Sequence, residues 1–318
     1  MSAATAVLRR IKFSREVVLL GVLIVLMVVM SLLSPLFFTV GNLLNTSRFF
    51  VEVGLMALGM TLIIITGGID LSVGSNLALV SVAVGFSYAA GLPLPLAIVF
   101  GLVVGLAAGL FNGLFITLLD LHPLVVTLGT FALFQGLAYG LTKAEAISDF
   151  PDWFAYFGQA YFGPVPLQLF VFILAVVVVW LVLSRTSFGR YVYAIGNNEE
   201  AARFSGVPVR KVKLALYAGI GLLVAMASVI YTSRVYTARG DSGLGLELDV
   251  ISAVVLGGAS IYGGSGTIGG TVLGVLIIAT LRNGLTLAGV PTTWIVFVLG
   301  VLLLVAVFLN EFFRRREV

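Results

Sequence analysis

The stretch that decides the fold is residues 49–76, FFVEVGLMALGMTLIIITGGIDLSVGSN. Its first part, Phe49–Thr66, is an almost uninterrupted apolar run close to the ~20 residues that a transmembrane helix needs. Three glycines then interrupt helical structure around Asp70. Irregular backbone and a carboxylate are tolerated at membrane depth only where protein or water satisfies their polar groups. The stretch therefore predicts a membrane-spanning helix followed by a functional break.

Apolar runs of this kind fill the rest of the chain. Of its 318 residues, 60% are hydrophobic and 10% charged, which is too few charges to cover a water-facing surface. The predicted spans are residues 17–33, 49–66, 76–91, 94–118, 123–142, 167–184, 214–233, 250–262, 268–288 and 294–310, of which the eighth is short enough to be re-entrant. We therefore expect one transmembrane domain over residues 1–318, an all-α polytopic membrane protein with about ten transmembrane helices and interrupted Gly-rich segments.

The basic residues predict the orientation of the chain. Most of the 18 Lys and Arg residues lie in residues 1–16, in the loop 185–213 and in the tail 311–318. Basic segments stay in the cytoplasm, and even numbers of predicted spans separate these three. Both termini are therefore expected in the cytoplasm, with the first span retained in the membrane and not removed as a signal peptide.

The sequence contains few of the residues and motifs on which enzymes depend. It has no Cys, a single His (His122) and no Gly-Lys-Ser/Thr phosphate-binding loop. Thiolate chemistry, a clustered metal site and a Walker-type ATP site are therefore not expected. We predict no catalytic residues, no metal ligands and no cofactor, so any ATP would have to be bound by another protein.

The loop 185–213 contains a predicted short helix. Asn197 is the expected N-cap, with Glu200 as its reciprocal partner, and Gly206 is the expected stop. A helix this short needs something to pack against. We expect it to dock a soluble partner, although a helix lying on lipid headgroups is the alternative. The predicted docking residues are Asn197, Asn198, Glu199, Glu200, Ala201, Arg203, Phe204 and Gly206.

Polar residues within the apolar segments are candidates for a translocation pathway. They are Asp70, Ser72, Ser75, Asn76, Asn112, Gln135 and Asn283. Asp70 alternatively caps the next helix through the amides of Ser72 or Val73, and the others alternatively hydrogen-bond between helices. Arg48 and Glu52 are spaced to pair on one helix face. The glycines of a second break, residues 256–266, partly repeat those of the first, by coincidence or as a paired interrupted helix.

Four stretches resemble one protein family. They are GGIDLSVGS at residues 67–75, FGRYVYAIGNNE at residues 188–199, ELDVISAVVLGG at residues 247–258 and the Gly-rich run that follows it as far as Gly270. They are similar to those of ribose-type permeases, the membrane subunits of bacterial ATP-binding-cassette sugar importers. One departure is Gln135-Gly136, where many members have Arg-Gly, and this puts the substrate in doubt.

The resemblance implies a subunit that carries a monosaccharide or small polyol across the bacterial inner membrane by alternating access. It implies cytoplasmic ATP-binding subunits, a second permease subunit, identical or different, and an external sugar-binding protein, with no nucleic acid. Asp241, Glu247 and Asp249 lie on the expected outer side and are candidates to contact the binding protein, or are simply solvated. An ion-coupled secondary transporter, with Asp70 as the coupling group, is the alternative.

Overall fold

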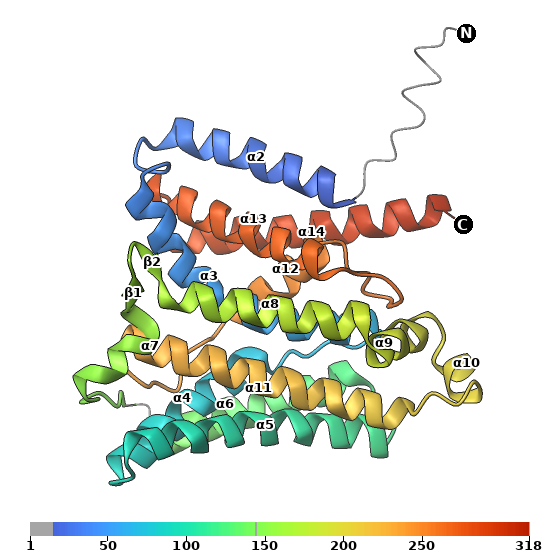
Figure 1. Ribbon diagram of the computed structural model, residues 1–318, viewed down its shortest axis with the longest axis horizontal. Coiled ribbons are helices and arrows are strands. Elements are labelled where there is room, and N and C mark those ends of the chain that lie inside the picture. Colours follow the sequence, from blue (N-terminus) through green and yellow to red (C-terminus); the bar gives the residue numbers. More distant parts are fainter. Residues whose placement is uncertain (1–14, 144, 318) are drawn as a thin grey trace, which may run out of the picture.

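The architecture is all-α, as the sequence predicted, in a computed structural model that describes residues 15–143 and 145–317, with side chains described as far as residue 308 (Figure 1). The helices are α2 (Arg15–Leu33), α3 (Val40–Ile65), α4 (Val73–Ala89), α5 (Leu94–Leu118), α6 (Pro123–Thr142), η1 (Asp152–Phe154), α7 (Ala155–Gln159), α8 (Leu167–Arg185), α9 (Ser187–Asn197), α10 (Glu199–Phe204), α11 (Val209–Val235), α12 (Leu246–Leu256), α13 (Ile268–Leu287) and α14 (Thr292–Glu317). A β-hairpin of two short strands, β1 (Tyr161–Phe162) paired antiparallel with β2 (Val165–Pro166), precedes α8. All but the last two residues of the predicted basic N-terminus, and the side chains of the predicted basic tail, lie outside the described residues.

Seven of the described helices are long and apolar enough to cross a membrane: α2, α3, α5, α6, α8, α11 and α13. Helices α4 and α14 supply shorter apolar segments. Helix α12 has only 11 residues, so it rises about 16 Å, half of a hydrocarbon layer of about 30 Å. The eighth predicted span, residues 250–262, was therefore wrong in its bounds, because the helix ends at Leu256 and a loop follows.

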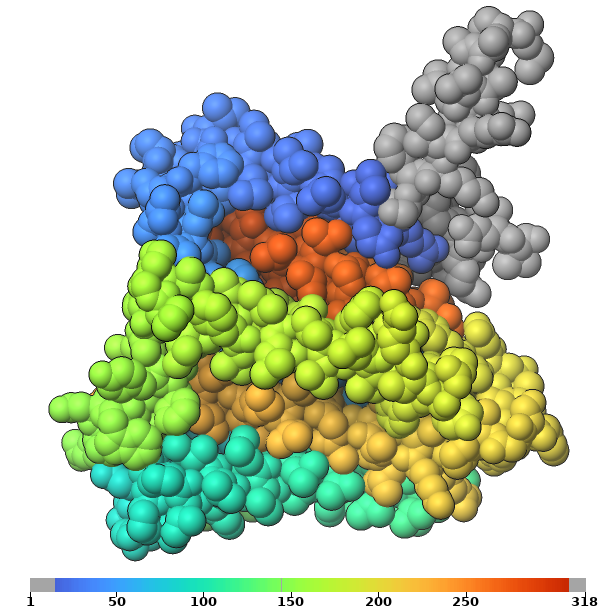
Figure 2. Space-filling model, viewed as in Figure 1, coloured from blue at the N-terminus to red at the C-terminus, as the bar shows by residue number. Residues whose placement is uncertain are grey.

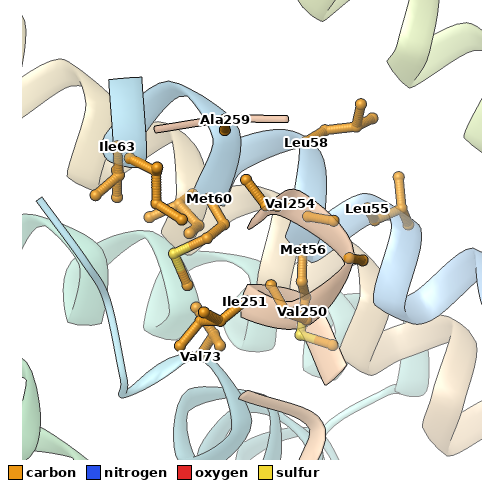
Figure 3. Close-up of a cluster of buried hydrophobic side chains, with 14 of the residues drawn as sticks. Leu55, Met56, Leu58, Met60, Ile63, Val73, Val250, Ile251, Val254 and Ala259 are labelled. Carbon is orange, nitrogen blue, oxygen red and sulfur yellow. The ribbon is translucent and has the colours of Figure 1, made fainter. Parts of the chain in front are cut away.

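Helix α3 is the centre of the bundle. Most of its apolar length is buried inside the protein, whereas α2 at the edge of the bundle exposes most of its apolar side chains, as a lipid-facing helix does. Figure 3 shows Met56 and Met60 of α3 packed against Val250 and Val254 of α12. The helix before the first break and the short helix before the second break thus share one core.

Helices α5 and α11 approach each other closely through glycine. A Cβ atom on Gly109 of α5 would lie 2.1 Å from the carbonyl oxygen of Tyr217 on α11, and one on Gly221 would lie 2.4 Å from the carbonyl oxygen of Gly105. Small residues allow such backbone contact between membrane helices. The contact fixes the polar side chains of α5 and α11 relative to the break after α3.

The two ends of the bundle differ. The start of α2, the C-terminal end of α14 and the short helices α9 and α10 lie at one end, on the right in Figure 1, and α7 with the hairpin lies at the other. Figure 2 shows α10 projecting at the right-hand edge of the molecule. The end that carries α10 is called the α10 end below, and the other is called the hairpin end.

Candidate functional site

The break after α3 holds a buried carboxylate. Oδ1 of Asp70 accepts hydrogen bonds from the backbone amide of Ser72 at 2.8 Å and from its hydroxyl at 2.6 Å. Asn112 of α5 donates to the Ser72 hydroxyl oxygen at 2.8 Å. Asp70 is 2% exposed, and Ser72 and Asn112 are each 1% exposed. Asp70 thus stabilises the turn that leads into α4, as the capping interpretation predicted.

Further polar groups surround this turn. The Ser75 hydroxyl donates to the carbonyl oxygen of Ser72 at 3.0 Å, and Ser75 and Asn76 are both buried at the start of α4. Within the described residues, Oδ1 of Asn76, Oδ1 of Asn112 and the Tyr217 hydroxyl have no hydrogen-bond partner. The break is therefore a sealed polar cluster with unused hydrogen-bonding capacity, and it unites five of the seven predicted pathway residues.

The other two predicted pathway residues lie elsewhere. The Gln135 side chain of α6 donates to the carbonyl oxygen of Gly240, in the loop between α11 and α12. Asn283 of α13 exchanges two side-chain hydrogen bonds with Asn42 of α3, at 2.9 and 3.0 Å. Consequently the predicted residues do not form one site.

The two glycine-rich breaks contact each other, and the end of α9 joins them. The amide of Gly264 donates to the carbonyl oxygen of Ile65, the last residue of α3, at 2.9 Å. A Cβ atom on Gly196 of α9 would lie 1.8 Å from that same oxygen. Only glycine permits this approach. The segment that leads into α10 is therefore in direct backbone contact with both breaks.

Helix α10 begins one residue later than expected. Its cap is Asn198, whose side chain accepts from the amide of Ala201 at 2.9 Å, and not Asn197, which is the last residue of α9. Asn198 has the extended backbone of a cap, with φ −162° and ψ 106°. The expected stop is confirmed, because Gly206 has φ +86° and its amide bonds to the carbonyl oxygen of Arg203.

Helix α10 is anchored on one side and exposed on the other. Ala202 is buried, and Glu199 pairs with Lys213 of α11 at 2.5 Å and with Arg203 at 3.4 Å. Phe204, by contrast, is 92% exposed. Large, nearly fully exposed aromatic side chains are typical of protein-binding surfaces. The face formed by Glu200, Arg203 and Phe204 is available to a partner, and we call it the α10 face.

A cavity of about 430 Å³ at the hairpin end was not predicted from the sequence. It is lined by Thr46, Phe49, Phe50, Glu52 and Val53 of α3, Tyr231 and Arg234 of α11, Asp241, Gly243 and Leu244 of the following loop, Leu246 and Asp249 of α12, and Val275, Ile278, Ala279, Arg282, Asn283 and Thr286 of α13. We call it the hairpin-end cavity. One predicted pathway residue, Asn283, lies in it.

Two ion pairs cross the wall of the hairpin-end cavity. Glu52 accepts two hydrogen bonds from Arg234, at 2.8 and 2.9 Å, and Asp249 pairs with Arg282 at 2.7 Å. The expected pairing of Arg48 with Glu52 was wrong: Arg48 donates instead to the Tyr161 hydroxyl at 3.1 Å and to the carbonyl oxygen of Gly158 at 3.2 Å. The sequence did contain a signal for the actual pair. Arg234, whose charge is opposite to that of Glu52, lies at the expected outer end of another predicted span.

The three acidic residues predicted to contact a binding protein have different surroundings. Asp249 is 5% exposed inside the cavity. Glu247 accepts from the amide of Gly245 at 3.2 Å. Asp241 is the most accessible, and the neighbouring Arg239 guanidinium, at 2.7 Å, lowers the pKa of its carboxyl group below the ordinary value. Among the described residues, no group of three or more His, Cys, Asp or Glu residues is arranged to hold a metal ion.

The long apolar helices are those of a membrane protein, and comparison with known proteins identifies its family. A sequence model of the family described as "Branched-chain amino acid transport system / permease component" matches residues 42–307. The chain therefore belongs to this family of permease components. It is a translocation subunit of the bacterial inner membrane and not an enzyme, and ATP hydrolysis belongs to partner subunits.

Individual relatives are similar over almost the whole chain. The ribose import permease protein RbsC of Bacillus subtilis (strain 168) is 45% identical over 291 residues, which cover 91% of this chain and 90% of that protein. The autoinducer 2 import system permease protein LsrD of Escherichia coli (strain K12) is 39% identical over 304 residues, with 94% and 92% coverage. No solved structure matches the chain. The resemblance inferred from the motifs is thus confirmed at the level of the permease family.

Proposed function

We propose that this chain forms the membrane pathway of an ATP-driven importer that carries a neutral monosaccharide or a similar small polyol into the bacterial cell. The named substrates of the two relatives, ribose and autoinducer 2, support this substrate class. The proposed complex contains a second permease subunit, cytoplasmic ATP-binding subunits and an external sugar-binding protein. The ATP-binding subunits are needed because the sequence has no phosphate-binding loop of its own.

The proposed topology has ten membrane segments, with both termini in the cytoplasm. Helices α4 and α14 would add two crossings to the seven long apolar helices, and α12 with the loop after it would form the tenth segment. The start of α2, the end of α14 and α10 all lie at the α10 end (Figure 1), which is the arrangement that an even number of crossings between them requires. The hairpin end would then face the outside.

The observation that carries the proposed mechanism is the exposed side chain of Phe204 on a helix whose other side is anchored. We propose that the ATP-binding subunits bind the α10 face. Their closure would move α10 and α9, and Gly196 would transmit that movement to the two breaks through its contact with Ile65. A movement of α9 would be passed on at this contact, because closely packed protein interiors have low compressibility.

Phe204→Ala in the complete importer tests this docking role. With the importer in proteoliposomes, we expect sugar uptake to fall by about tenfold or more, as for loss of an interface anchor. ATP hydrolysis should persist without its coupling to uptake. Phe100→Ala is the matched control, because Phe100 is also exposed but lies within the apolar membrane helix α5 and not on a surface expected to bind a partner. Normal uptake by Phe204→Ala, and by a Glu200→Ala/Arg203→Ala variant, would contradict the docking role.

For the predicted pathway residues, the proposal divides their roles. Asp70, Ser72, Ser75, Asn76 and Asn112 would hold the inner end of the pathway closed until α9 moves. Their burial and mutual hydrogen bonds support a sealed gate and not a site open to solute.

The remaining candidates lie nearer the hairpin end. Gln135 would fix the loop after α11 through Gly240, and Asn283 would line the outer part of the path. Asp241, the most exposed of the three acidic candidates, would contact the sugar-binding protein together with Glu247. Asp249 would serve the cavity instead, because it is buried there.

The ion-coupled alternative, with Asp70 as the coupling group, is not favoured by the relatives, which are import-system permeases. Reconstitution separates the two functions. We expect no uptake by this chain alone under a proton or sodium gradient, and ATP-dependent uptake of D-ribose once the ATP-binding and sugar-binding partners are added. Gradient-driven accumulation by the chain alone would overturn the proposal.

A further inference from the structure

The wall of the hairpin-end cavity contains charged side chains, and its carboxylates are paired with arginines. Glu52 and Asp249 are 3% and 5% exposed, yet each carboxylate faces an arginine that also lines the cavity. The remaining carboxylate in the wall, Asp241, is paired with Arg239. Because each charge has a counter-charge at hydrogen-bond distance, the cavity places polar groups in a largely apolar lining without a net attraction for an ion of either sign.

The wall also keeps hydrogen-bonding capacity free for a guest. Arg282 contacts Asp249 through Nη2, and its guanidinium carries further N–H donors beside that contact. The Arg282 side chain as a whole is 44% exposed, so it borders the open space of the cavity. Neighbouring Asn283 also lines the cavity, and beside its two hydrogen bonds with Asn42 its amide keeps one N–H and one acceptor position for a guest. A guest with adjacent hydroxyl groups would match this mixture of donors and acceptors.

Aromatic rings complete the wall. Phe49 and Tyr231 hold the Arg234 guanidinium at 4.6 and 5.3 Å from their ring centroids, and both rings line the cavity. The Arg234–Glu52 pair is thereby fixed, whereas the Arg282–Asp249 pair borders the opening with the exposed side chain of Leu244. A volume of about 430 Å³ lies within the usual range of about 300–1,000 Å³ for small-molecule sites.

We infer that the hairpin-end cavity is a binding site for a neutral polyhydroxylated solute, with Arg282, Asp249 and Asn283 as its hydrogen-bonding groups. This inference rests on the proposed function, and it adds a sugar-binding site within a single permease subunit. The solute class follows from the balanced charges and from the remaining guanidinium donors of Arg282, because a neutral polyol needs hydrogen bonds and no counter-ion. An anionic sugar phosphate would meet three carboxylates whose arginines are already engaged.

Cysteine protection tests the inference directly, because the natural chain has no cysteine. Ala279→Cys places one thiol in the cavity wall, and Ser87→Cys places the matched control at the end of α4, outside the cavity. Both variants are assembled into the complete importer in nanodiscs and treated with a charged, membrane-impermeant thiol reagent. The probes are D-ribose, D-xylose and D-galactose, with ribose 5-phosphate as the anionic comparison.

At a sugar concentration of ten dissociation constants, labelling of Ala279→Cys should slow by about tenfold, while Ser87→Cys is unaffected. Ribose 5-phosphate should give no protection. Equal labelling of Ala279→Cys with and without each neutral sugar would overturn the inference. Protection that requires only the sugar-free binding protein would also overturn it, since the cavity would then be a protein-docking pocket.

Arg282→Lys supplies a second test that does not depend on the thiol. The lysine keeps the charge opposite Asp249 but not the planar array of donors. We expect the KM for sugar uptake to rise several-fold, with kcat and expression close to those of the natural chain. An unchanged KM would contradict the role of Arg282. If the importer carries a sugar normally but that sugar does not protect Ala279→Cys, the inference fails while the proposed function stands.

Discussion

This apolar protein has two polar regions with buried carboxylates, and the two regions compensate the buried charge in opposite ways. At the break after α3, one carboxylate, Asp70, is satisfied by neutral donors and is sealed from solvent. In the hairpin-end cavity, the buried carboxylates of Glu52 and Asp249 are satisfied by arginines and border an open space. The sealed region holds a turn in place, whereas the open region has capacity for a guest. Burial and pairing, and not the mere presence of charge, separate a structural polar cluster from a candidate solute site.

The largest effect should come from breaking the fixed ion pair of the cavity. Glu52→Gln leaves Arg234, whose side chain is only 15% exposed, without its counter-charge. Removal of one partner of a buried pair destabilises a protein by about 3–5 kcal/mol. We expect a large drop in the melting temperature of the detergent-solubilised protein, measured by thermal-shift or size-exclusion assays. Glu200→Gln, on the exposed face of α10, is the control and should leave the melting temperature unchanged.

An intermediate effect is expected at the sealed cluster. Asp70→Ala removes the acceptor for both Ser72 groups, which should destabilise the protein by about 1–3 kcal/mol. Asp70→Asn keeps an acceptor oxygen at the same place, so it should retain most of the stability and measurable uptake. The same melting assay, with uptake by the complete importer, distinguishes the two variants. An Asp70→Asn variant that melts normally but transports nothing would show that Asp70 has a charge-dependent role in transport and is not a purely structural group.

The smallest effect should be found at the rim of the cavity. Asp241 and Arg239 are about half exposed, so Asp241→Asn should change stability by no more than about 0.5 kcal/mol. Because Arg239 lowers the pKa of Asp241 in the folded protein, this small contribution is present above the ordinary carboxyl pKa. It is lost as the pH falls through the lowered folded-state pKa. Melting curves of the two forms should therefore differ slightly at neutral pH and converge in acid; a larger difference in acid would contradict this reading.

The sequence predicted the helices well, because membrane helices are encoded in long local runs. The run at residues 49–66, for example, lies almost wholly within α3. The true helix starts earlier, at Val40, because polar groups such as Asn42 find partners in the fold that a hydropathy pattern does not contain. The cap of α10 was displaced by one residue, since nothing local indicates that α9 continues through Asn197.

The sites were less predictable, because they depend on contacts between distant segments. Local spacing favoured Arg48 as the partner of Glu52, but the actual partner, Arg234, is 182 residues away in sequence. Helical spacing cannot reveal such a pair. For the same reason the sequence identified Asp70 and Asn112 as separate candidates without placing them beside Ser72, and it gave no sign of the cavity.

The central claim is that the importer alternates between a sealed break and an open outer cavity. Thiol accessibility of Asn76→Cys, in the sealed break, compared with Ala279→Cys, in the cavity, tests it most directly. In vesicles without nucleotide, we predict that Ala279→Cys reacts from the outside and that Asn76→Cys is unreactive from both sides. During ATP turnover with loaded binding protein, Asn76→Cys should become reactive from the cytoplasmic side. Rapid labelling of Asn76→Cys at rest, or labelling that ATP does not change, would contradict the account.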